Sequence, residues 1–365
     1  MLYMIMRQRD NGLHKEKAGD GGRCHHPPFI QQRLICLFCL SFREKSGRNR
    51  VMRNQTHTAE FILIGFSTTR GLQNVLFAPC LVFYLVLLGG NTAIVTMACL
   101  DPRLHTPMYF FLCNFSVAET LVTSTVVPRM LAGLMVERSA ISFGGCLAQF
   151  YFYFSLGSTT FLLLAVMSID RYVAICHPLH YSVILSSRVC IQLALGSWAV
   201  PFLFMIPPTI FRSLLSFCSS NQIDHFFCDN APLLKLSCSD TRLIELGDFL
   251  LAILFVLSSF VVIIASYVAI ISTILKIPSN TGRQKTFSTC TSHLIVVGIG
   301  YGTAIFIYVR PGKSHSTDMN KMVALLTAVV TPFLSPFIFT LRNQKVKEVF
   351  SDWLGNLRGL QRTKL

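Results

Sequence analysis

Long stretches without Lys, Arg, Asp or Glu recur along the chain from residue 71 onward. Each is rich in Leu, Ile, Val and Phe and lacks polar–apolar alternation, which favours membrane-spanning helices of about 20 residues over the strands of a transmembrane barrel. The charge-free stretches are 71–100, 139–169, 189–211, 249–275, 286–309 and 322–341. A further apolar stretch between Arg103 and Arg129 contains a single carboxylate, Glu119. The pattern predicts seven spans, near 76–99, 107–132, 142–175, 190–211, 247–274, 286–309 and 321–341.

The composition agrees with this pattern. Of the 365 residues, 52% are hydrophobic and only 13% are charged, whereas soluble globular chains carry about 25% charged residues. So few charges could not cover the surface of soluble domains, and the same numbers exclude a disordered chain. Thirteen cysteines in this length are too sparse for a small disulfide-dense fold. The sequence therefore predicts an all-α polytopic membrane protein, built as a bundle of seven transmembrane helices.

Three observations predict the orientation in the membrane. Loop Lys and Arg residues are slightly more numerous on the side of the C-terminus, which weakly favours a cytoplasmic C-terminus. Asn54 begins an Asn-Gln-Thr glycosylation acceptor ahead of the first span. The long loop between spans four and five carries Cys218, Cys228 and Cys238, which suits an oxidising compartment. We therefore expect an extracellular N-terminus, with Asn54 glycosylated, and a cytoplasmic C-terminus.

Residues 1–51 do not fit the transmembrane pattern. The segment is strongly basic, and such charge resists translocation across a membrane. Its apolar run at 34–42 is too short to span, and no clean signal-peptide cleavage site follows it. We interpret residues 1–51 as a basic, disordered extension ahead of a true start at Met52. The expected organisation is then an extracellular N-terminus at 52–75, a seven-span domain at 76–341, and a cytoplasmic tail at 342–365.

Four sequence segments at the ends of the predicted spans are specific. They are PMYFFL at 107–112, MSIDRYVAICHPLHY at 167–181, KTFSTCTSHL at 285–294 and SPFIFTLRN at 335–343. Together they resemble the odorant receptors, a branch of the rhodopsin-like G-protein-coupled receptors, and the resemblance covers about residues 54–354. In the long loop, FCD at 227–229 and PLLKLSC at 232–238 are similar to the tetrapod-type class of that branch.

Asp170, Arg171 and Tyr172 place an ion pair at the cytoplasmic end of span three. Taken alone, the pattern also fits an interfacial arginine that extends toward the lipid headgroups. The resemblance favours coupling, because in the family this arginine is held in the resting state and then moves to contact the C-terminal helix of the G protein. It therefore implies that Arg171 carries the coupling and that the partner is a stimulatory, olfactory-type heterotrimeric G protein.

Four cysteines are candidates for disulfides. Cys146 begins span three, and Cys218, Cys228 and Cys238 lie in the long loop; the sequence alone permits three pairings among them. The resemblance implies a bond between Cys146 and Cys228, which leaves Cys218 and Cys238 to pair with each other. A lone His225 beside a cysteine engaged in a disulfide is a poor metal site, and we expect neither a metal nor a cofactor.

Glu119 is an ionisable residue within a predicted span, which makes it a candidate functional residue. In many rhodopsin-like relatives an Asp at this position joins an Asn in span seven to hold sodium. This chain departs from that pattern at Glu119 and at Ser335, and Phe339 replaces a tyrosine, so we expect no sodium site. We interpret Glu119 as a buried polar residue that titrates during activation. Pro336 is expected to kink span seven because it lacks a backbone N–H.

The expected ligand site lies between spans three, five and six, where the resemblance places the odorant cavity. Helical spacing gives the inward face of span three, counted back from Arg171, and that of span six, and the resemblance adds the residues of span five. Any one of these residues is more typical of helix packing than of ligand contact. The candidates are Phe150, Tyr153, Phe154, Gly157, Ser158, Leu251, Ala252, Phe255, Tyr301, Ala304, Ile305 and Tyr308. As a set they are aromatic and apolar, with hydroxyls from Ser158, Tyr301 and Tyr308. Because no ionisable group lies on this part of spans three and six, we expect a small, neutral, volatile ligand such as an alcohol, aldehyde, ketone or ester.

The tail after the last span has apolar residues at helical spacing with basic residues between them, at Val346, Val349, Phe350, Trp353 and Leu354. This pattern favours a short amphipathic helix on the inner membrane leaflet over a disordered basic tail.

Three functions are compatible with a seven-span membrane protein. The first is an odorant receptor at the plasma membrane that activates the olfactory stimulatory G protein and so adenylyl cyclase. The second is a chemosensory receptor of the same build outside the olfactory epithelium. The third is a transporter or membrane enzyme, which the sequence disfavours because it offers no intramembrane cluster of His, Glu and Asp, no Gly-rich phosphate loop and no nucleophile–base pair. Membrane lipid is an expected partner, and nucleic acid is not.

Overall fold

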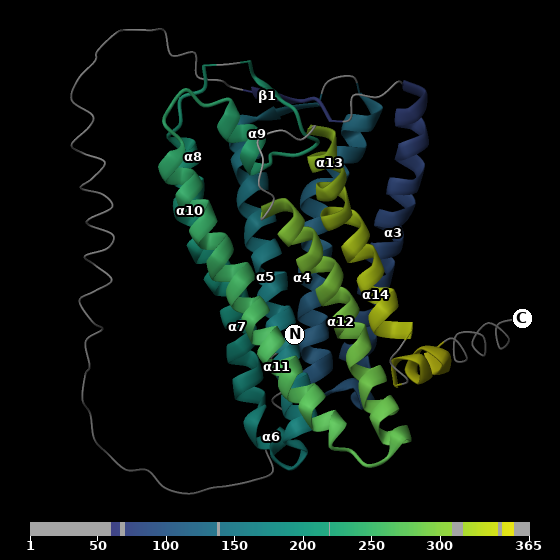
Figure 1. Ribbon diagram of the computed structural model, residues 1–365. Coiled ribbons are helices and arrows are strands. Elements are labelled where there is room, and N and C mark those ends of the chain that lie inside the picture. Colours follow the sequence, from purple (N-terminus) through teal and green to yellow (C-terminus); the bar gives the residue numbers. More distant parts are fainter. Residues whose placement is uncertain are drawn as a thin grey trace, which may run out of the picture. The chain divides into compact units, whose positions relative to one another are not determined.

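The computed structural model of the protein describes residues 60–65, 70–136, 139–218, 220–308, 317–341 and 345–353. Within them, long helices run side by side, and short strands lie at one end of the bundle (Figure 1). The elements are β1 (Glu60–Leu63), α3 (Arg70–Leu100), η2 (Pro102–Leu104), α4 (Pro107–Met135), β2 (Ser139–Ser142), α5 (Phe143–Cys176), η3 (Pro178–His180), α6 (Tyr181–Ile184), α7 (Ser187–Phe204), α8 (Ile206–Ser213), β3 (Gln222–Ile223), α9 (Asn230–Lys235), α10 (Arg242–Ala252), η4 (Ile253–Leu257), α11 (Ser258–Leu275), α12 (Asn280–Tyr308), α13 (Thr317–Leu325), η5 (Leu326–Val330) and α14 (Thr331–Leu341).

The helices follow the predicted spans closely. In the described part of the chain, six helical stretches are long and apolar enough to cross a membrane, and α12 holds a shorter apolar stretch, His293–Ala304. Three of the spans are composite: α7 continues into α8, α10 into η4 and α11, and α13 into η5 and α14. Both η4 and η5 are π-helical, a variation often found at functional sites. The predicted seven-helix bundle is thus confirmed, with several helices longer than their apolar stretch.

Local sequence sets where the helices begin and end. Pro107 occupies the first turn of α4, where its missing N–H costs no hydrogen bond. The side-chain oxygen of Ser142 accepts a hydrogen bond from the backbone N–H of Gly145 at 3.1 Å and so caps α5. That helix ends at Cys176, just before His177 and Pro178, because the residue ahead of a proline is disfavoured in helical conformation.

The long helix α5 lies among α4, α7, α11 and α12 and contacts all of them. Its buried residues join one large apolar core, which includes Phe111, Leu163, Ile263 and Ile270. By contrast, the outer faces of the bundle expose many large apolar side chains, of which Val261 on α11 is one. In water such an apolar surface would cause aggregation, whereas in a membrane it contacts the lipid chains. Each helix is therefore apolar on both its inner and its outer face.

The short strands form one sheet in the order β2-β1-β3. Strand β1 pairs antiparallel with β2, with Phe61 opposite Ile141, and parallel with β3. Phe61 and Ile223 are completely buried in a small core beside Cys146 and Cys228. The all-α bundle thus carries a small sheet that the sequence analysis did not predict, with residues 60–63 as its central strand. We call this end of the bundle the disulfide end and the opposite end the Arg171 end.

A short helix follows α14 at residues 345–353, as the tail pattern predicts. Val346 and Val349 are buried against the main core, and Trp353 packs beside them. Phe350 instead exposes 47% of its surface, and contact of this helix with the inner leaflet stays a prediction. Leu354 lies outside the described residues.

Candidate functional site

A cavity of about 150 Å³ lies within the bundle. Nine of the predicted ligand residues line it: Phe150, Tyr153, Phe154, Gly157, Ser158, Leu251, Ala252, Phe255 and Ala304. An apolar cavity of this size holds a molecule as large as benzene. A Cβ atom built on Gly157 would have no heavy atom within 4 Å, so the missing side chain at this position leaves open space. That these residues contact a ligand stays a prediction.

One predicted ligand residue lies away from the cavity, and two others are not tested. Tyr301 is not among the lining residues: its hydroxyl donates to Ser259 Oγ at 2.6 Å, and its ring packs against Phe161 and Phe260 at centroid distances of 4.9 and 5.0 Å. The side chains of Ile305 and Tyr308 lie outside the described part of the chain. Of the three predicted hydroxyls, Ser158 therefore stands at the cavity wall and Tyr301 does not.

The cavity also has walls that the sequence analysis missed. Phe115, Glu119 and Val122 of α4 line it, as do Thr327 of η5 and Thr331 of α14. The α4 residues could have been found, because Phe115 and Val122 lie four residues before and three after Glu119, on the same helical face. No sequence pattern indicated that Thr327 and Thr331 line the cavity.

Ionisable residues stand at this cavity, contrary to the expectation drawn from spans three and six alone. Besides Glu119, the carboxylate of Asp248 in α10 lines the cavity together with Asn230 of α9. Asp248 forms an ion pair with the fully buried Arg212, with 2.5 Å between Arg212 Nη2 and Asp248 Oδ2. A ligand in the cavity would therefore meet a carboxylate whose charge is balanced by Arg212.

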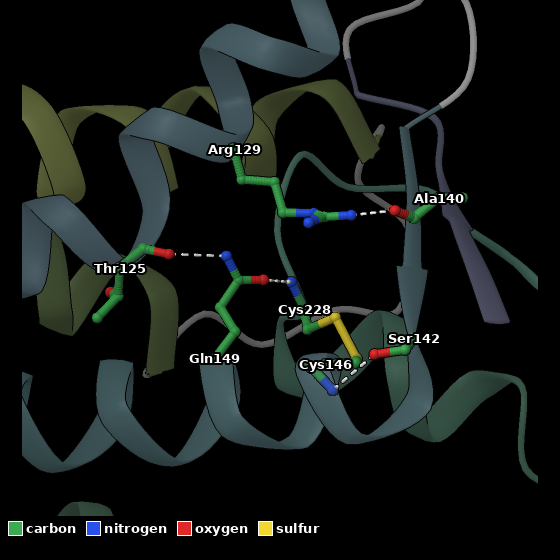
Figure 2. Close-up of a disulfide and its surroundings, with 8 residues drawn as sticks. Thr125, Arg129, Ala140, Ser142, Cys146, Gln149 and Cys228 are labelled. Carbon is green, nitrogen blue, oxygen red and sulfur yellow. Dashed lines mark hydrogen bonds between the residues drawn. A yellow bond between two sulfur atoms is a disulfide. The ribbon is translucent and has the colours of Figure 1, made fainter. Parts of the chain in front are cut away.

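At the disulfide end, covalent bonds hold the long loop in place. Cys146 is bonded to Cys228 and Cys218 to Cys238, with Cα–Cα distances of 5.5 and 5.7 Å. Gln149 lies beside the first disulfide and bridges two elements: its Nε2 donates to the Thr125 carbonyl at 2.8 Å, and its Oε1 accepts from the Cys228 N–H at 3.0 Å (Figure 2).

Two more contacts join segments at this end. Arg129 of α4 donates to the carbonyl of Ala140 in β2 (Figure 2). Lys321, which is 1% exposed at its side chain, pairs with Asp224 at 2.5 Å and donates to the Gly65 carbonyl at 2.6 Å. Lys321 therefore links the first residues of α13 to the long loop and to the segment after β1.

His225 is buried in the same loop between aromatic rings. Its ring lies 4.6 Å from those of both Phe226 and Phe227, and neither of its nitrogens has a hydrogen-bond partner among the described residues. Burial lowers the pKa of His225 below its ordinary value, an effect that Lys321 adds to and that the acidic residues Asp229 and Asp224 oppose. The imidazole is therefore neutral when the loop is folded.

At the Arg171 end, an ion pair joins Asp170 and Arg171, with 2.5 Å between Arg171 Nη2 and Asp170 Oδ2. The other carboxylate oxygen of Asp170, Oδ1, accepts a hydrogen bond from the hydroxyl of Tyr181 at 2.7 Å. Tyr172 turns elsewhere, since its hydroxyl lies 3.0 Å from Nε2 of His177. The structure thus brings Asp170 and Arg171 together, and it adds Tyr181, whose role the sequence did not suggest.

Burial raises the pKa of Tyr181 well above its ordinary value, and the adjacent Asp170 carboxylate raises it further. The phenol is therefore protonated and available as a donor at physiological pH.

A second polar network connects three helices between the cavity and Arg171. His293 of α12 lies 3.0 Å from the Leu164 carbonyl of α5 through Nε2, and 2.8 Å from the Tyr267 hydroxyl of α11 through Nδ1. A carbonyl only accepts, so Nε2 carries the proton, and in a neutral imidazole Nδ1 then accepts from Tyr267. The network fixes one tautomer and one spacing of α5, α11 and α12.

Comparison with known proteins identifies the family. A family model described as olfactory receptor matches residues 80–356. The chain is 49% identical to olfactory receptor 6S1 of Homo sapiens over 294 residues, which cover 80% of this chain and 89% of the relative. It is 47% identical to olfactory receptor 6E1 of Mus musculus over 313 residues, covering 86% of this chain and all of the relative.

The chain belongs to the olfactory receptor family.

The receptor's fold is also that of a solved structure. It is similar to the crystal structure of squid rhodopsin, with a TM-score of 0.64, 15% sequence identity, and coverage of 79% of this chain and 82% of that one. The resemblance recognised in the sequence is confirmed at both levels, family and fold. The receptor is therefore a multi-pass membrane protein and not an enzyme.

The predicted activation relay of the olfactory receptor is only partly described. Glu119 is buried, and its Oε2 has no hydrogen-bond partner among the described residues. The Ser335 hydroxyl donates within its own helix, to the Thr331 carbonyl at 3.0 Å. Pro336 meets α3 closely, since a Cβ on Gly90 would lie 3.1 Å from Pro336 Cβ. The side chain of Phe339 and the glycosylation candidate Asn54 lie outside the described residues, so these roles stay predictions.

Proposed function

We propose that this olfactory receptor binds small, neutral, volatile odorants in the cavity and activates a stimulatory, olfactory-type G protein at the Arg171 end, which raises cyclic AMP. The disulfide end is then extracellular and the Arg171 end cytoplasmic, in the plasma membrane. The observation that carries the proposal is that one helix, α5, supplies both the cavity wall at Phe154, Gly157 and Ser158 and the ion pair of Arg171.

The geometry separates the two activities along that helix. Ser158 and Arg171 are 13 positions apart, which at 1.5 Å per residue is about 20 Å. A ligand in the cavity does not contact the G protein, so its effect must reach Arg171 through a change in helix packing. The His293 network lies on this path and holds the three helices that would have to shift.

The lining of the cavity predicts the strength of binding. Apolar burial contributes roughly 25 cal/mol per Å² before the costs of association. A molecule the size of benzene has little area to bury, so we expect affinities in the micromolar range.

The test is a panel of volatile alcohols, aldehydes, ketones and esters applied to cells that express the receptor, with cyclic AMP as the readout. The matched control is Arg171→Ala, which should reach the surface and lose the response. A receptor that responds equally well without Arg171 contradicts the proposed coupling. Uptake of a radiolabelled compound without any cyclic AMP response would instead favour a transporter.

A further inference from the structure

A charged cluster stands at the cavity, formed by residues from three elements. Arg212 comes from α8, Asn230 from α9 and Asp248 from α10. Asn230 and Asp248 line the cavity. Arg212 is not a lining residue, and it donates hydrogen bonds to Asn230 Oδ1 and to Asp248 Oδ2. Asn230 Nδ2 also donates to Asp248 Oδ2, at 2.8 Å. Each member of the cluster therefore contacts the other two.

Arg212 is fixed in this position. Its side chain is completely buried, Nη1 donates to the Pro208 carbonyl at 3.0 Å, and its guanidinium carbon lies 4.2 Å from the centre of the Phe150 ring. A buried arginine with this many contacts does not turn toward a ligand without breaking several of them. Its effect on the cavity is to orient Asp248 and to balance that carboxylate's charge.

Asp248 keeps an unused acceptor. Among the described residues, the two side-chain hydrogen bonds that it accepts both fall on Oδ2, and its side chain is 20% exposed. Within that part of the chain Oδ1 has no partner, so it can accept from a molecule in the cavity. Because Arg212 cancels the charge, an ammonium ion gains little net attraction here, whereas a neutral O–H donor gains a charge-assisted hydrogen bond.

We propose that Asp248, positioned by Arg212 and Asn230, is the polar anchor of the odorant site and selects ligands that carry a hydroxyl group, alcohols or phenols. The inference rests on the proposed function and makes its ligand class narrower. The apolar body of the ligand would then pack against the rings of Phe150, Phe154 and Phe255, which line the same cavity. An ether, ester or ketone of the same skeleton fits this space and has no proton to donate.

The test uses pairs of ligands with one carbon skeleton, an alcohol and its methyl ether, together with the corresponding primary amine. Potency is measured by cyclic AMP in cells that express the full chain, normalised to receptor at the surface. A hydrogen bond to a charged acceptor predicts that the alcohol is more potent than the ether by about tenfold or more. The alcohol should also be more potent than the amine.

Removing Asp248 alone would leave Arg212 buried and unpaired, which can prevent folding. The test variant is therefore the double substitution Arg212→Met and Asp248→Leu, since a buried ion pair can be replaced by apolar residues of similar volume. Its alcohol-to-ether ratio should fall to near one, with the ether response retained. The matched control is Glu245→Gln, which removes an exposed carboxylate from the same helix and should keep the ratio.

Two results would overturn the inference. One is a wild-type receptor that responds equally to alcohols and their ethers, which leaves the proposed function standing. The other is a double variant that reaches the surface and keeps the full alcohol preference. A receptor with Arg171 intact that responds to no volatile at all contradicts the proposed function itself, and the inference with it.

Discussion

The hydrogen bond from Tyr181 to Asp170 predicts how strongly the resting receptor is held. Substituting Tyr181→Phe removes one hydroxyl and leaves the ring in place. Asp170 is 1% exposed, and its Oδ1 accepts from Tyr181 at 2.7 Å while Oδ2 serves Arg171. The variant thus takes away the donor to Oδ1 and keeps the ion pair.

The size of the effect follows from the charge on the acceptor. A hydrogen bond to a charged group contributes about 1.5–3 kcal/mol, and the raised pKa of Tyr181 ensures that its proton is present to donate. If activation separates Asp170 from Tyr181 as well as from Arg171, whose movement the family resemblance implies, the bond stabilises the resting state alone. Losing about 1.4 kcal/mol from that state raises the active fraction about tenfold, provided that the active state is scarce at the outset.

The assay is cyclic AMP in the absence of odorant, divided by the amount of receptor at the surface. The matched control is Tyr151→Phe, which deletes a hydroxyl of α5 that donates to the Phe202 carbonyl at 3.0 Å, far along the helix from Asp170. Basal signalling should rise in the first variant and stay unchanged in the second. Unchanged basal signalling in Tyr181→Phe at normal surface levels would refute the reasoning.

Three further predictions concern the cavity and the disulfide end. Gly157→Val places methyl groups in open space and should shift the agonist ranking toward smaller odorants; an unaltered ranking at normal surface levels would put the ligand elsewhere. Cys146→Ser removes the bond to Cys228, whose 82-residue separation corresponds to about 4–5 kcal/mol of chain entropy, and should retain the receptor inside the cell, as surface labelling would show. Because the pKa of His225 is lowered in the folded loop, the unfolded chain binds more protons below pH 6.5, so thermal stability should fall on acidification below about that value. His225→Phe should weaken this pH dependence in a thermal-shift measurement, and an identical pH profile would contradict the assignment.

Much of the fold could be predicted because each transmembrane helix is specified by its own stretch of sequence. Apolar length alone located the spans, and counting from Arg171 in helical turns found Phe150 to Ser158 at the cavity. The same counting failed at Tyr301, because the cavity is lined by Gly300 and Ala304, one turn apart, and Tyr301 points to a different sector of α12 and packs there on Phe260.

Features that depend on distant pairing were missed for a physical reason. Strand β1 has four residues, and its partners lie at 139–142 and 222–223, so no local pattern distinguishes it from a loop. Arg212 and Asp248 are 36 positions apart, and each looked like an ordinary charge at the edge of a span. The contact between Arg212 and Asp248 depends on α8, which continues α7 beyond the apolar stretch that ends at residue 211.

The two ends of the bundle are held by interactions of unequal strength, and this bears on which end an odorant can move. At the disulfide end, the Cys146–Cys228 bond ties the long loop to α5, and the ion pair between the buried Lys321 and Asp224 ties it to α13, while the Cys218–Cys238 bond closes the loop on itself. At the Arg171 end, the bonds of Asp170 and His293 are hydrogen bonds and one ion pair, each contributing a few kcal/mol at most. A ligand shifts an equilibrium only by the difference between its affinities for the two states, and a weakly bound odorant supplies no more than a few kcal/mol. That is enough to break such contacts and too little to rearrange a covalently closed end, so we expect the helices to separate at the Arg171 end.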